Sequence, residues 1–299
     1  MLRAFIAGIA CATAIRAARD ARKQRRNTNV PNSDARDAAA MTSTTRTGSA
    51  LYDSPRAVEE YLTFHYSVAR DTVDAALRIF PYEDLVRDGV DVRAALRFVE
   101  ACARVVVDAL EERLAGETSA EATSALDVGC AVGGTSAALA KRGRFARVVG
   151  VDYSHAFIDA AKRAQMGEFD VERNGIDADA EALSRCEFER GDACALRKDI
   201  GTFDAVIAAN VLCRLPDPET FLRACATLTK PGGVVVLASP YSWLEQWTPR
   251  ERWLDFTAVR AILEPAFALE RECDLPFIIR EHARKFQLGV SHVAVFRRV

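Results

Sequence analysis

Hydrophobic and polar positions alternate on two different periods along this chain. Short apolar runs of strand length lie at residues 124–129, 147–152, 186–193, 203–210 and 232–240. Stretches of helical period, such as 154–164 and 219–228, separate these runs. This alternation of strands and helices predicts a mainly parallel sheet with helices on both faces. Two more strands close to the C-terminus follow each other without a helix, which predicts an antiparallel hairpin at the sheet edge.

Helical patterning also precedes the first strand. Ser54 is suited to cap a helix whose first position is Pro55, and the run DVRAALRFVEACARVVVDALEERLAG is amphipathic until Gly116. We expect residues 49–117 to form a helical cap that packs on or over whatever the sheet binds. Residues 118–299 are then expected to form the main domain.

The first 48 residues differ in composition from the rest. They contain nine basic residues against three acidic ones and are rich in Ala, Arg, Ser and Thr. This composition predicts a disordered leader or an organelle transit peptide, for mitochondrion or plastid, although an N-terminal extension without any address fits equally well. The expected location is therefore the cytoplasm or an organelle.

Several classes of function are disfavoured by composition. The chain after residue 48 is acidic, which argues against a nucleic-acid backbone as partner. No run of 18 apolar residues predicts a membrane span. The eight cysteines form no C-x-x-C pair, so neither a zinc site nor a disulfide framework is indicated, and we expect no metal and a reducing compartment.

A glycine-containing turn follows the first predicted strand. In LDVGCAVGGTSAALA the turn opens a helix, so backbone N–H groups and the positive end of the helix dipole would face a ligand. Gly129, Ala131 and Gly134 alone form only a loose dinucleotide fingerprint. Asp152 ends the next strand about 20 residues later, where a carboxylate can accept hydrogen bonds from both ribose hydroxyls. Nicotinamide enzymes and other nucleoside-binding proteins share these two features.

The later motifs favour one cofactor over the other. In order, the chain contains Asp127-x-Gly129-Cys130, Asp152, Gly191-Asp192-Ala193, Phe203-Asp204 and Pro231-Gly232-Gly233. This series resembles that of class I S-adenosylmethionine-dependent methyltransferases and covers about residues 120–240. The resemblance implies a Rossmann-like α/β fold with a seven-stranded, mostly parallel sheet and an antiparallel last hairpin. It also implies S-adenosylmethionine as the cofactor and disfavours a nicotinamide dehydrogenase.

The resemblance assigns parts of the cofactor to individual residues. Gly129 and Cys130 would approach the methionine part, Asp152 the ribose, and Asp192 with Ala193 the adenine. Ala131 stands where many members have glycine, and we expect its methyl group to be tolerated at a negative φ. Asp127 has the alternative of a capping acid and Cys130 that of a small packing residue. The full set of expected cofactor residues is Asp127, Gly129, Cys130, Ala131, Gly133, Asp152, Tyr153, Ser154, Asp192, Ala193, Asn210 and Val211.

Segments outside these motifs resemble a narrower group. YDSPRAVEEYLTFHY, ALDVGCAVGGTS, NVLCRLPDP, SPYSWLEQWTPRERWL and PFIIREHARKFQLGVSHVAVFRR are similar to the C-terminal methyltransferase module of ovothiol-biosynthesis enzymes, over about residues 51–299. That family N-methylates the imidazole of 5-thiohistidine (4-mercaptohistidine). The fused members carry an upstream His-x-x-x-His-x-Glu iron motif, whereas the first 50 residues here contain no histidine. We therefore expect a separate sulfoxide synthase or lyase to supply the thiohistidine, or the chain to be a split or truncated relative of the fused enzymes.

The acceptor would be met by residues around the expected methyl position. Asn210 and Tyr241 are the candidates for orienting the imidazole, and Glu281 or Glu245 could meet an ammonium group. All three tryptophans of the chain lie within residues 239–254, and we expect Trp243 to line the acceptor site while Trp247 and Trp253 pack this segment on the body. The expected substrate residues are Tyr52, Tyr61, His65, Tyr66, Arg214, Tyr241, Trp243, Arg280, Arg284, Lys285 and Phe286.

These assignments leave alternatives. Arg280, Arg284 and Lys285 suit a carboxylate or thiolate, or they form a solvated turn. His65 and Tyr66 can be packing residues, and Asn210 can be a structural cap. Other acceptors, namely histidine, a related thiol or a small amine, fit the same motifs, as does a binding protein that has lost turnover. A nucleic-acid methyltransferase is disfavoured because VLC follows Asn210, where base methylators have Asn-Pro-Pro-aromatic.

Overall fold

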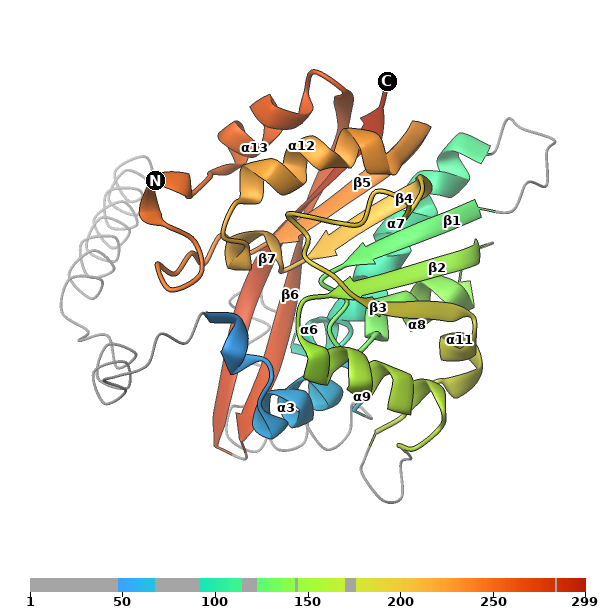
Figure 1. Ribbon diagram of the computed structural model, residues 1–299, viewed down its shortest axis with the longest axis vertical. Helices are drawn as coiled ribbons and strands as arrows, with labels where there is room; N and C mark the ends of the chain where they lie inside the picture. The colour runs from blue at the N-terminus through green and yellow to red at the C-terminus, as the bar shows by residue number, and fades with distance from the viewer. Residues whose placement is uncertain (1–47, 68–91, 115–122, 143–144, 170–175, 283) are drawn as a thin grey trace, which may run out of the picture. The chain divides into compact units, whose positions relative to one another are not determined.

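The chain folds around a seven-stranded sheet of order β3-β2-β1-β4-β5-β7-β6 (Figure 1). The computed structural model describes residues 48–67, 92–114, 123–142, 145–169, 176–282 and 284–299. The first five strands pair in parallel, and β7 runs antiparallel to both β5 and β6. The strands are β1 (Thr123–Val128), β2 (Phe145–Asp152), β3 (Cys186–Arg190), β4 (Phe203–Ala209), β5 (Thr229–Ser239), β6 (Phe267–His282) and β7 (Lys285–Arg298). The predicted fold class, with its reversed last hairpin, is confirmed.

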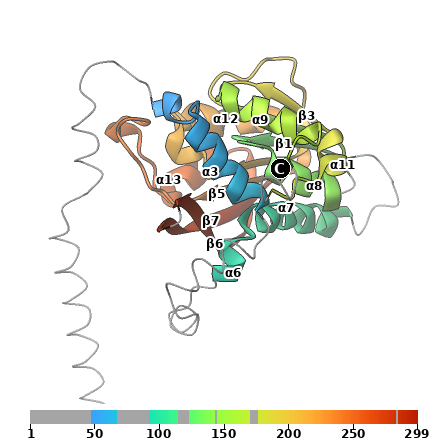
Figure 2. The same ribbon diagram turned by 90° about the horizontal axis from the view of Figure 1, so that it is seen from below.

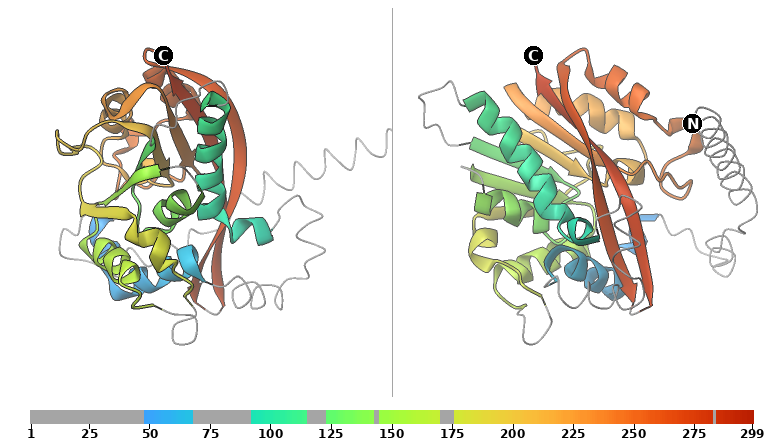
Figure 3. Two further views of the ribbon diagram at one scale, coloured as in Figure 1. Left: turned by 90° about the vertical axis from the view of Figure 1, so that its right-hand side faces the viewer. Right: turned by 180° about the vertical axis from the view of Figure 1, so that it is seen from behind.

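Helices cover both faces of the sheet. The helices are α3 (Pro55–Tyr66), α6 (Val92–Ala95), α7 (Phe98–Leu114), α8 (Gly134–Arg142), α9 (His155–Gln165), α11 (Ala180–Ser184), α12 (Pro218–Leu228) and α13 (Phe256–Leu263). Three short 3₁₀ helices are η1 (Gly48–Leu51), η2 (Leu212–Arg214) and η3 (Arg250–Arg252). Figure 3, seen from behind, shows α7 crossing one face, and Figure 1 shows α12 and α13 on the other.

Side-chain alternation along the central strands explains this two-faced arrangement. Successive residues of a strand point to opposite faces. On β4, Ala205 and Ile207 join the core beneath α7, α8 and α9, whereas Val206 and Ala208 join the core beneath α12 and α13. All four are fully buried. A strand that is apolar at every position must be covered on both sides, as the short apolar runs of the sequence predict.

Local capping sets the starts of several helices. The side chains of Ser54, Ser154, Asp217 and Asp255 each accept a hydrogen bond from a backbone N–H of the first turn of the following helix. Such caps satisfy N–H groups that have no partner within the helix. Ser54 and the following proline therefore fix the start of α3, as the sequence predicts.

The cap helix α3 packs against α8, α9 and β6 (Figure 2). It thus reaches from the helices that follow β1 and β2 to the edge strand β6. The long amphipathic run after residue 91 is broken into α6 and α7, and α7 packs against α8, β4 and β5. The leader predicted for residues 1–48 lies outside the described residues except for Gly48.

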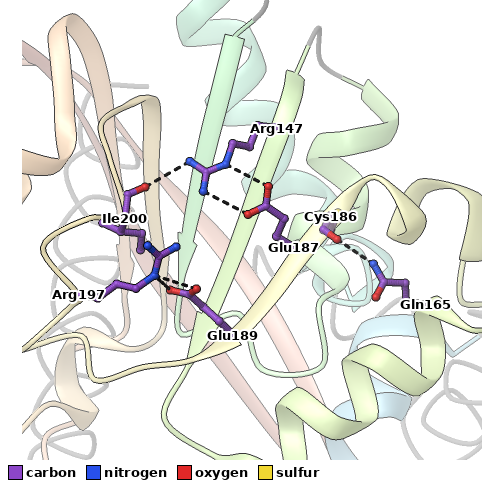
Figure 4. A network of polar contacts seen from close by, with 7 residues as sticks. All are labelled: Arg147, Gln165, Cys186, Glu187, Glu189, Arg197 and Ile200. Atoms are coloured by element: carbon purple, nitrogen blue, oxygen red, sulfur yellow. Dashed lines mark hydrogen bonds and ion pairs between the residues drawn. The ribbon is translucent and has the colours of Figure 1, made fainter.

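The β3 edge is tied down by polar contacts shown in Figure 4. Arg147 on β2 donates to both carboxylate oxygens of Glu187 on β3, at 3.1 and 3.2 Å. Arg197 binds Glu189 of the same strand, and Gln165 Nε2 donates to the carbonyl of Cys186 at 2.8 Å. These contacts hold β3 in place at one edge of the sheet. The loop that follows β3 faces the site described below.

The β6–β7 hairpin is longer than the sequence pattern predicts. Strand pairing continues to His282 and Lys285, well beyond the part of β7 that pairs with β5. Within the described residues, no helix has the length and apolarity needed to cross a membrane.

Candidate active site

A cavity of about 340 Å³ opens at the carboxyl edge of the parallel strands. Ligands of open parallel sheets bind at this edge, and the volume falls within the usual range for small-molecule sites. One end is lined by the segments that follow β1, β2, β3 and β4, and the other by α3, the segment before it, η2 and residues 246–247. We name these the cofactor end and the acceptor end.

The turn after β1 has an unusual backbone. Gly129, Ala131 and Gly133 have φ values of 74°, 48° and 89°, so three residues of the turn occupy the left-handed region. The negative φ expected for Ala131 is therefore wrong, and its left-handed conformation costs about 1–2 kcal/mol. The Ala131 N–H donates to Asp152 at 2.9 Å, which offsets part of this cost. A Cβ at residue 129 would lie 2.7 Å from the Val211 side chain, so only glycine allows the turn to pack this closely on Val211.

Asp152 lies beside this turn and lines the cavity with it. One carboxylate oxygen accepts the N–H of Ala131 at 2.9 Å, and the other accepts the N–H of Ser154 at 2.8 Å. Burial nevertheless raises the pKa of Asp152 to about 6, against these hydrogen bonds. The backbone bonds fix the direction of the carboxylate, and each oxygen retains a lone pair for a ligand hydroxyl.

Three of the expected cofactor residues lie behind the turn and do not line the cavity. Asp127 is fully buried and accepts a 2.7 Å hydrogen bond from Ser136 on α8, so it acts as the capping acid that the sequence left as an alternative. Cys130 is buried, and its thiol is 3.6 Å from the carbonyl oxygen of Ala131. A Cβ on Gly133 would lie 2.7 Å from Phe188, so this glycine serves close packing.

The remaining expected cofactor residues do line the cavity: Gly129, Ala131, Asp152, Tyr153, Ser154, Asp192, Ala193, Asn210 and Val211. Asp192 is held by the N–H of Cys194 at 2.8 Å. Asn210 has a φ of 57°, and its Oδ1 accepts a 2.6 Å hydrogen bond from the buried Ser291 on β7. The amide is therefore held in a fixed orientation at the junction of the two ends.

Aromatic rings and one arginine form the acceptor end. Tyr52 packs on Trp247 with ring centroids 4.9 Å apart, and Tyr61 packs on Phe157 at 4.7 Å. Burial raises the pKa of Tyr61 well above its usual value, so the hydroxyl stays protonated. Arg214 donates through Nη1 to the carbonyls of Ser242 and Cys213, at 2.6 and 2.9 Å. Among the described residues lining the cavity, it is the one Lys or Arg.

Other expected acceptor residues point elsewhere. Tyr66 is buried and donates to the Val132 carbonyl at 2.7 Å, so it braces the glycine turn from behind. Tyr241 has a φ of 49° and packs near His292, which removes it from the cavity. Trp243 donates to the Leu254 carbonyl at 3.1 Å and packs into the core beneath α12 and α13. The expected roles of the indoles are therefore exchanged, because Trp247 lines the cavity and Trp243 packs the segment on the body.

The basic residues of the hairpin are also absent from the cavity lining. Arg280 pairs with Phe286 across the hairpin, and Arg284 is exposed beside His282. Lys285 binds Glu281 at 2.7 Å. Phe286 packs with Ile278 in a small satellite cluster. The solvated-turn alternative describes these residues better, since β6 extends past the cavity and carries its end away from it.

Sequence reasoning missed several lining residues, chiefly Phe64, Phe98, Thr135, Phe157, Gln246, Trp247 and Ile279. The clustered tryptophans did signal that residues 239–254 matter, but the pattern does not show which indole turns inward. Phe64, Phe98 and Phe157 lie on amphipathic helices, where an aromatic residue facing a cavity has the same spacing as one facing the core.

The site residues fit S-adenosylmethionine. Gly129 and Val211 pack closely and line the cavity, the fixed Asp152 carboxylate suits the two ribose hydroxyls, and Asp192 with Ala193 borders the same cavity. No cluster of His, Cys, Asp and Glu capable of holding a metal ion occurs in the part of the chain that the structure describes.

Comparisons with known proteins agree with this geometry. Residues 126–237 match the methyltransferase domain family. Ubiquinone biosynthesis O-methyltransferase of Coxiella burnetii (strain RSA 493 / Nine Mile phase I) is 37% identical over 109 residues, 36% of this chain and 39% of the relative. The enzyme of that name from Pseudomonas paraeruginosa (strain DSM 24068 / PA7) is 34% identical over 136 residues, 44% of this chain and 49% of the relative. The chain thus spans at most about half the length of these relatives.

Residues 126–237 are thus similar to a methyltransferase domain, which agrees with the fit of the site residues to S-adenosylmethionine. The family match, from residue 126 to residue 237, does not reach α3 or the hairpin. The acceptor end lies largely outside the matched region.

Solved structures of methyltransferases also align with the chain. Magnesium protoporphyrin IX methyltransferase from Synechocystis PCC 6803 aligns with a TM-score of 0.43 and 18% identity over 81% of this chain and 97% of that one. A TehB-like methyltransferase from Corynebacterium glutamicum aligns with a TM-score of 0.43 and 19% identity over 77% and 100%. The fold assignment itself comes from the strand order described above.

Proposed function

We propose that this protein transfers a methyl group from S-adenosylmethionine to a ring nitrogen of 5-thiohistidine, a late step of ovothiol biosynthesis. The observation that carries the proposal is an aromatic acceptor end with one arginine and, among the described residues that line the cavity, no free general base. This end is continuous with the cofactor end. The similarity of residues 51–299 to the ovothiol methyltransferase module supports the same acceptor.

The lack of a base decides between kinds of acceptor. Burial lowers the pKa of His65 to about 3, and its Nδ1 already accepts the N–H of Gly134 at 3.0 Å. Tyr61 is protonated, and the two carboxylates that line the cavity lie at its cofactor end. An imidazole, with a reference pKa of about 6.5, is mostly neutral at pH 7 and needs no base before attack. A phenol, with a pKa of about 10, does need one.

The residues at the acceptor end can then act by orientation. The cofactor supplies an electrophilic methyl group on a sulfonium, and an in-line approach of the nitrogen is the main requirement. Tyr52, Tyr61 and Trp247 can hold a flat ring between their faces. Asn210, held by Ser291, can orient the ring through a hydrogen bond. The proton released from the azolium product passes to water.

Arg214 favours an acceptor that carries a negatively charged group. Nη1 is held by two backbone carbonyls, and the rest of the guanidinium can bind a carboxylate or thiolate. Thiohistidine offers both groups. We also propose that a separate sulfoxide synthase or lyase forms its carbon–sulfur bond and supplies it to this site.

A phenolic acceptor is the second candidate, because the curated relatives are named ubiquinone O-methyltransferases. It receives less support, since the similarity to those relatives covers less than half of this chain and no free base faces the acceptor end.

A methyl-transfer assay tests the proposal. The full chain is incubated with S-adenosylmethionine and 5-thiohistidine, histidine or a catechol, and the products are identified by mass. We expect thiohistidine to gain one methyl group on nitrogen and to be preferred over histidine at least about tenfold. Methylation of the catechol without methylation of thiohistidine would overturn the proposal.

The variant Arg214→Gln tests in the same assay whether Arg214 binds the acceptor. We expect it to raise the acceptor KM about tenfold or more, as for loss of a charge-assisted hydrogen bond, with cofactor affinity unchanged. Arg250→Gln, at an exposed arginine, is the matched control. An unchanged acceptor KM in Arg214→Gln would show that the acceptor anion binds elsewhere.

A further inference from the structure

Residues 53–66 make hydrogen bonds to two segments of the cofactor end, the turn after β1 and the segment after β2. His65 Nδ1 accepts the N–H of Gly134, and the Tyr66 hydroxyl donates to the Val132 carbonyl at 2.7 Å. On the other side, Asp53 accepts the Ser154 hydroxyl at 2.8 Å and the Ala156 N–H at 3.2 Å. Residues separated by some 70 to 100 positions in the sequence are thereby joined around the cavity.

The His65 contact falls at the residue where the glycine turn becomes α8. Gly134 is the first residue of that helix, and the first N–H groups of a helix have no partner within it. A Cβ at residue 134 would lie 2.6 Å from His65 Nδ1, so the ring approaches the backbone as closely as glycine allows. A side chain from α3 therefore does for this turn what a local cap does for other helices.

The chemistry of the ring follows from its surroundings. Burial keeps His65 neutral, and a neutral imidazole carries one proton. Because Nδ1 accepts from Gly134, the proton must be on Nε2. The ring also lines the cavity, next to Thr135 and Tyr61, so it belongs both to the cofactor turn and to the acceptor end.

We infer that His65 is a positioning residue for S-adenosylmethionine binding, because the acceptor atom it presents to Gly134 holds the glycine turn in its left-handed conformation. The inference rests on the proposed cofactor, and it does not depend on the identity of the methyl acceptor. Cofactor affinity is then governed by a residue outside the region that matches the methyltransferase family.

Binding of S-adenosylhomocysteine to the full chain, measured by calorimetry, tests this role. We expect His65→Ala to weaken binding at least about tenfold, as for loss of one hydrogen bond that leaves a buried donor unsatisfied. His65→Asn keeps an acceptor oxygen near the position of Nδ1, and we expect it to stay within about threefold of the parent chain. His155→Ala, at an exposed histidine, is the matched control and should bind like the parent.

A second measurement reports on the contact itself, whatever the binding result. In His65→Leu, which lacks an acceptor, we expect the Gly134 amide proton to exchange at least about tenfold faster. The Ala137 amide, bonded to the Gly133 carbonyl at 2.9 Å, should change much less. The nitrogen chemical shifts of His65 in the parent chain should show a protonated Nε2 and an unprotonated Nδ1.

The outcomes separate this inference from the proposed function. If the parent chain binds no S-adenosylhomocysteine, the proposed function fails. If the parent binds and His65→Ala binds equally well, or His65→Asn is as weak as His65→Ala, only the positioning role is overturned. Unchanged exchange at Gly134 in His65→Leu would also overturn it.

Discussion

The two ends of the cavity are built in different ways. The cofactor end comes from the segments that follow four successive parallel strands, between residues 128 and 193 and at 209–211. The acceptor end is assembled from residues 52–65, 214–216 and 246–247, with two residues of α7 and one of β6. Regular strand endings position the first, whereas the second depends on how distant segments pack. Local motifs therefore reveal the cofactor chemistry, whereas the acceptor chemistry depends on tertiary contacts.

The largest effect that separates the two ends is expected at Asp152. In Asp152→Asn, one amide NH₂ must face a backbone N–H that the carboxylate now accepts, from Ala131 or Ser154. We expect the affinity for S-adenosylhomocysteine to fall about 10- to 100-fold, the cost of losing charged hydrogen bonds. Calorimetry on the full chain measures it. Affinity within threefold of the parent would show that this carboxylate does not bind the ribose.

Buried carboxylates also make the cofactor end sensitive to pH. Burial raises the pKa of Asp127 to about 7, above the usual 3.9 or so, against the Ser136 hydrogen bond. A raised pKa means that Asp127 contributes stability below about pH 4 and loses it as pH rises towards 7. Asp127→Asn can keep the Ser136 bond but cannot titrate.

We therefore expect the free energy of unfolding of the parent chain, relative to Asp127→Asn, to fall between about pH 4 and pH 7. The slope can reach about 1.4 kcal/mol per pH unit. Urea titrations of both proteins across this range measure the difference. A flat difference, or one that rises with pH, would mean that Asp127 keeps its ordinary pKa.

The sequence predicts the sheet because each central strand is apolar at consecutive positions and each is followed by a helix. It also predicts most of the cofactor end, since Gly129, Asp152 and Asp192 follow strands whose order is standard for the fold. Ala131 shows the limit of such reasoning. Its positive φ accompanies the hydrogen bond from its N–H to Asp152, a contact between distant residues that no local pattern reveals.

The acceptor end could not be predicted to the same depth. Trp243 and Trp247 are four residues apart in an irregular segment, and the inward one is chosen by hydrogen bonds such as that from Trp243 to Leu254. The basic residues of the hairpin were expected to bind the acceptor, with a solvated turn as the alternative, and strand pairing carries Arg280 past the cavity. Contacts with distant parts of the chain therefore decide whether these side chains face the cavity.

The smallest expected effect is that of a substitution at Arg284, which tests whether the hairpin lies outside the acceptor end. Arg284 is exposed on the hairpin, whereas Trp247 stacks on Tyr52 in the cavity. We expect Arg284→Ala to leave the acceptor KM within about twofold of the parent, since surface substitutions away from a site cost about 0.5 kcal/mol or less. Trp247→Ala in the same assay should raise it about tenfold or more. If Arg284→Ala instead impaired acceptor use as strongly as Trp247→Ala, the hairpin would have to reach the acceptor during turnover. The acceptor site would then include the β6–β7 hairpin as a third, movable component.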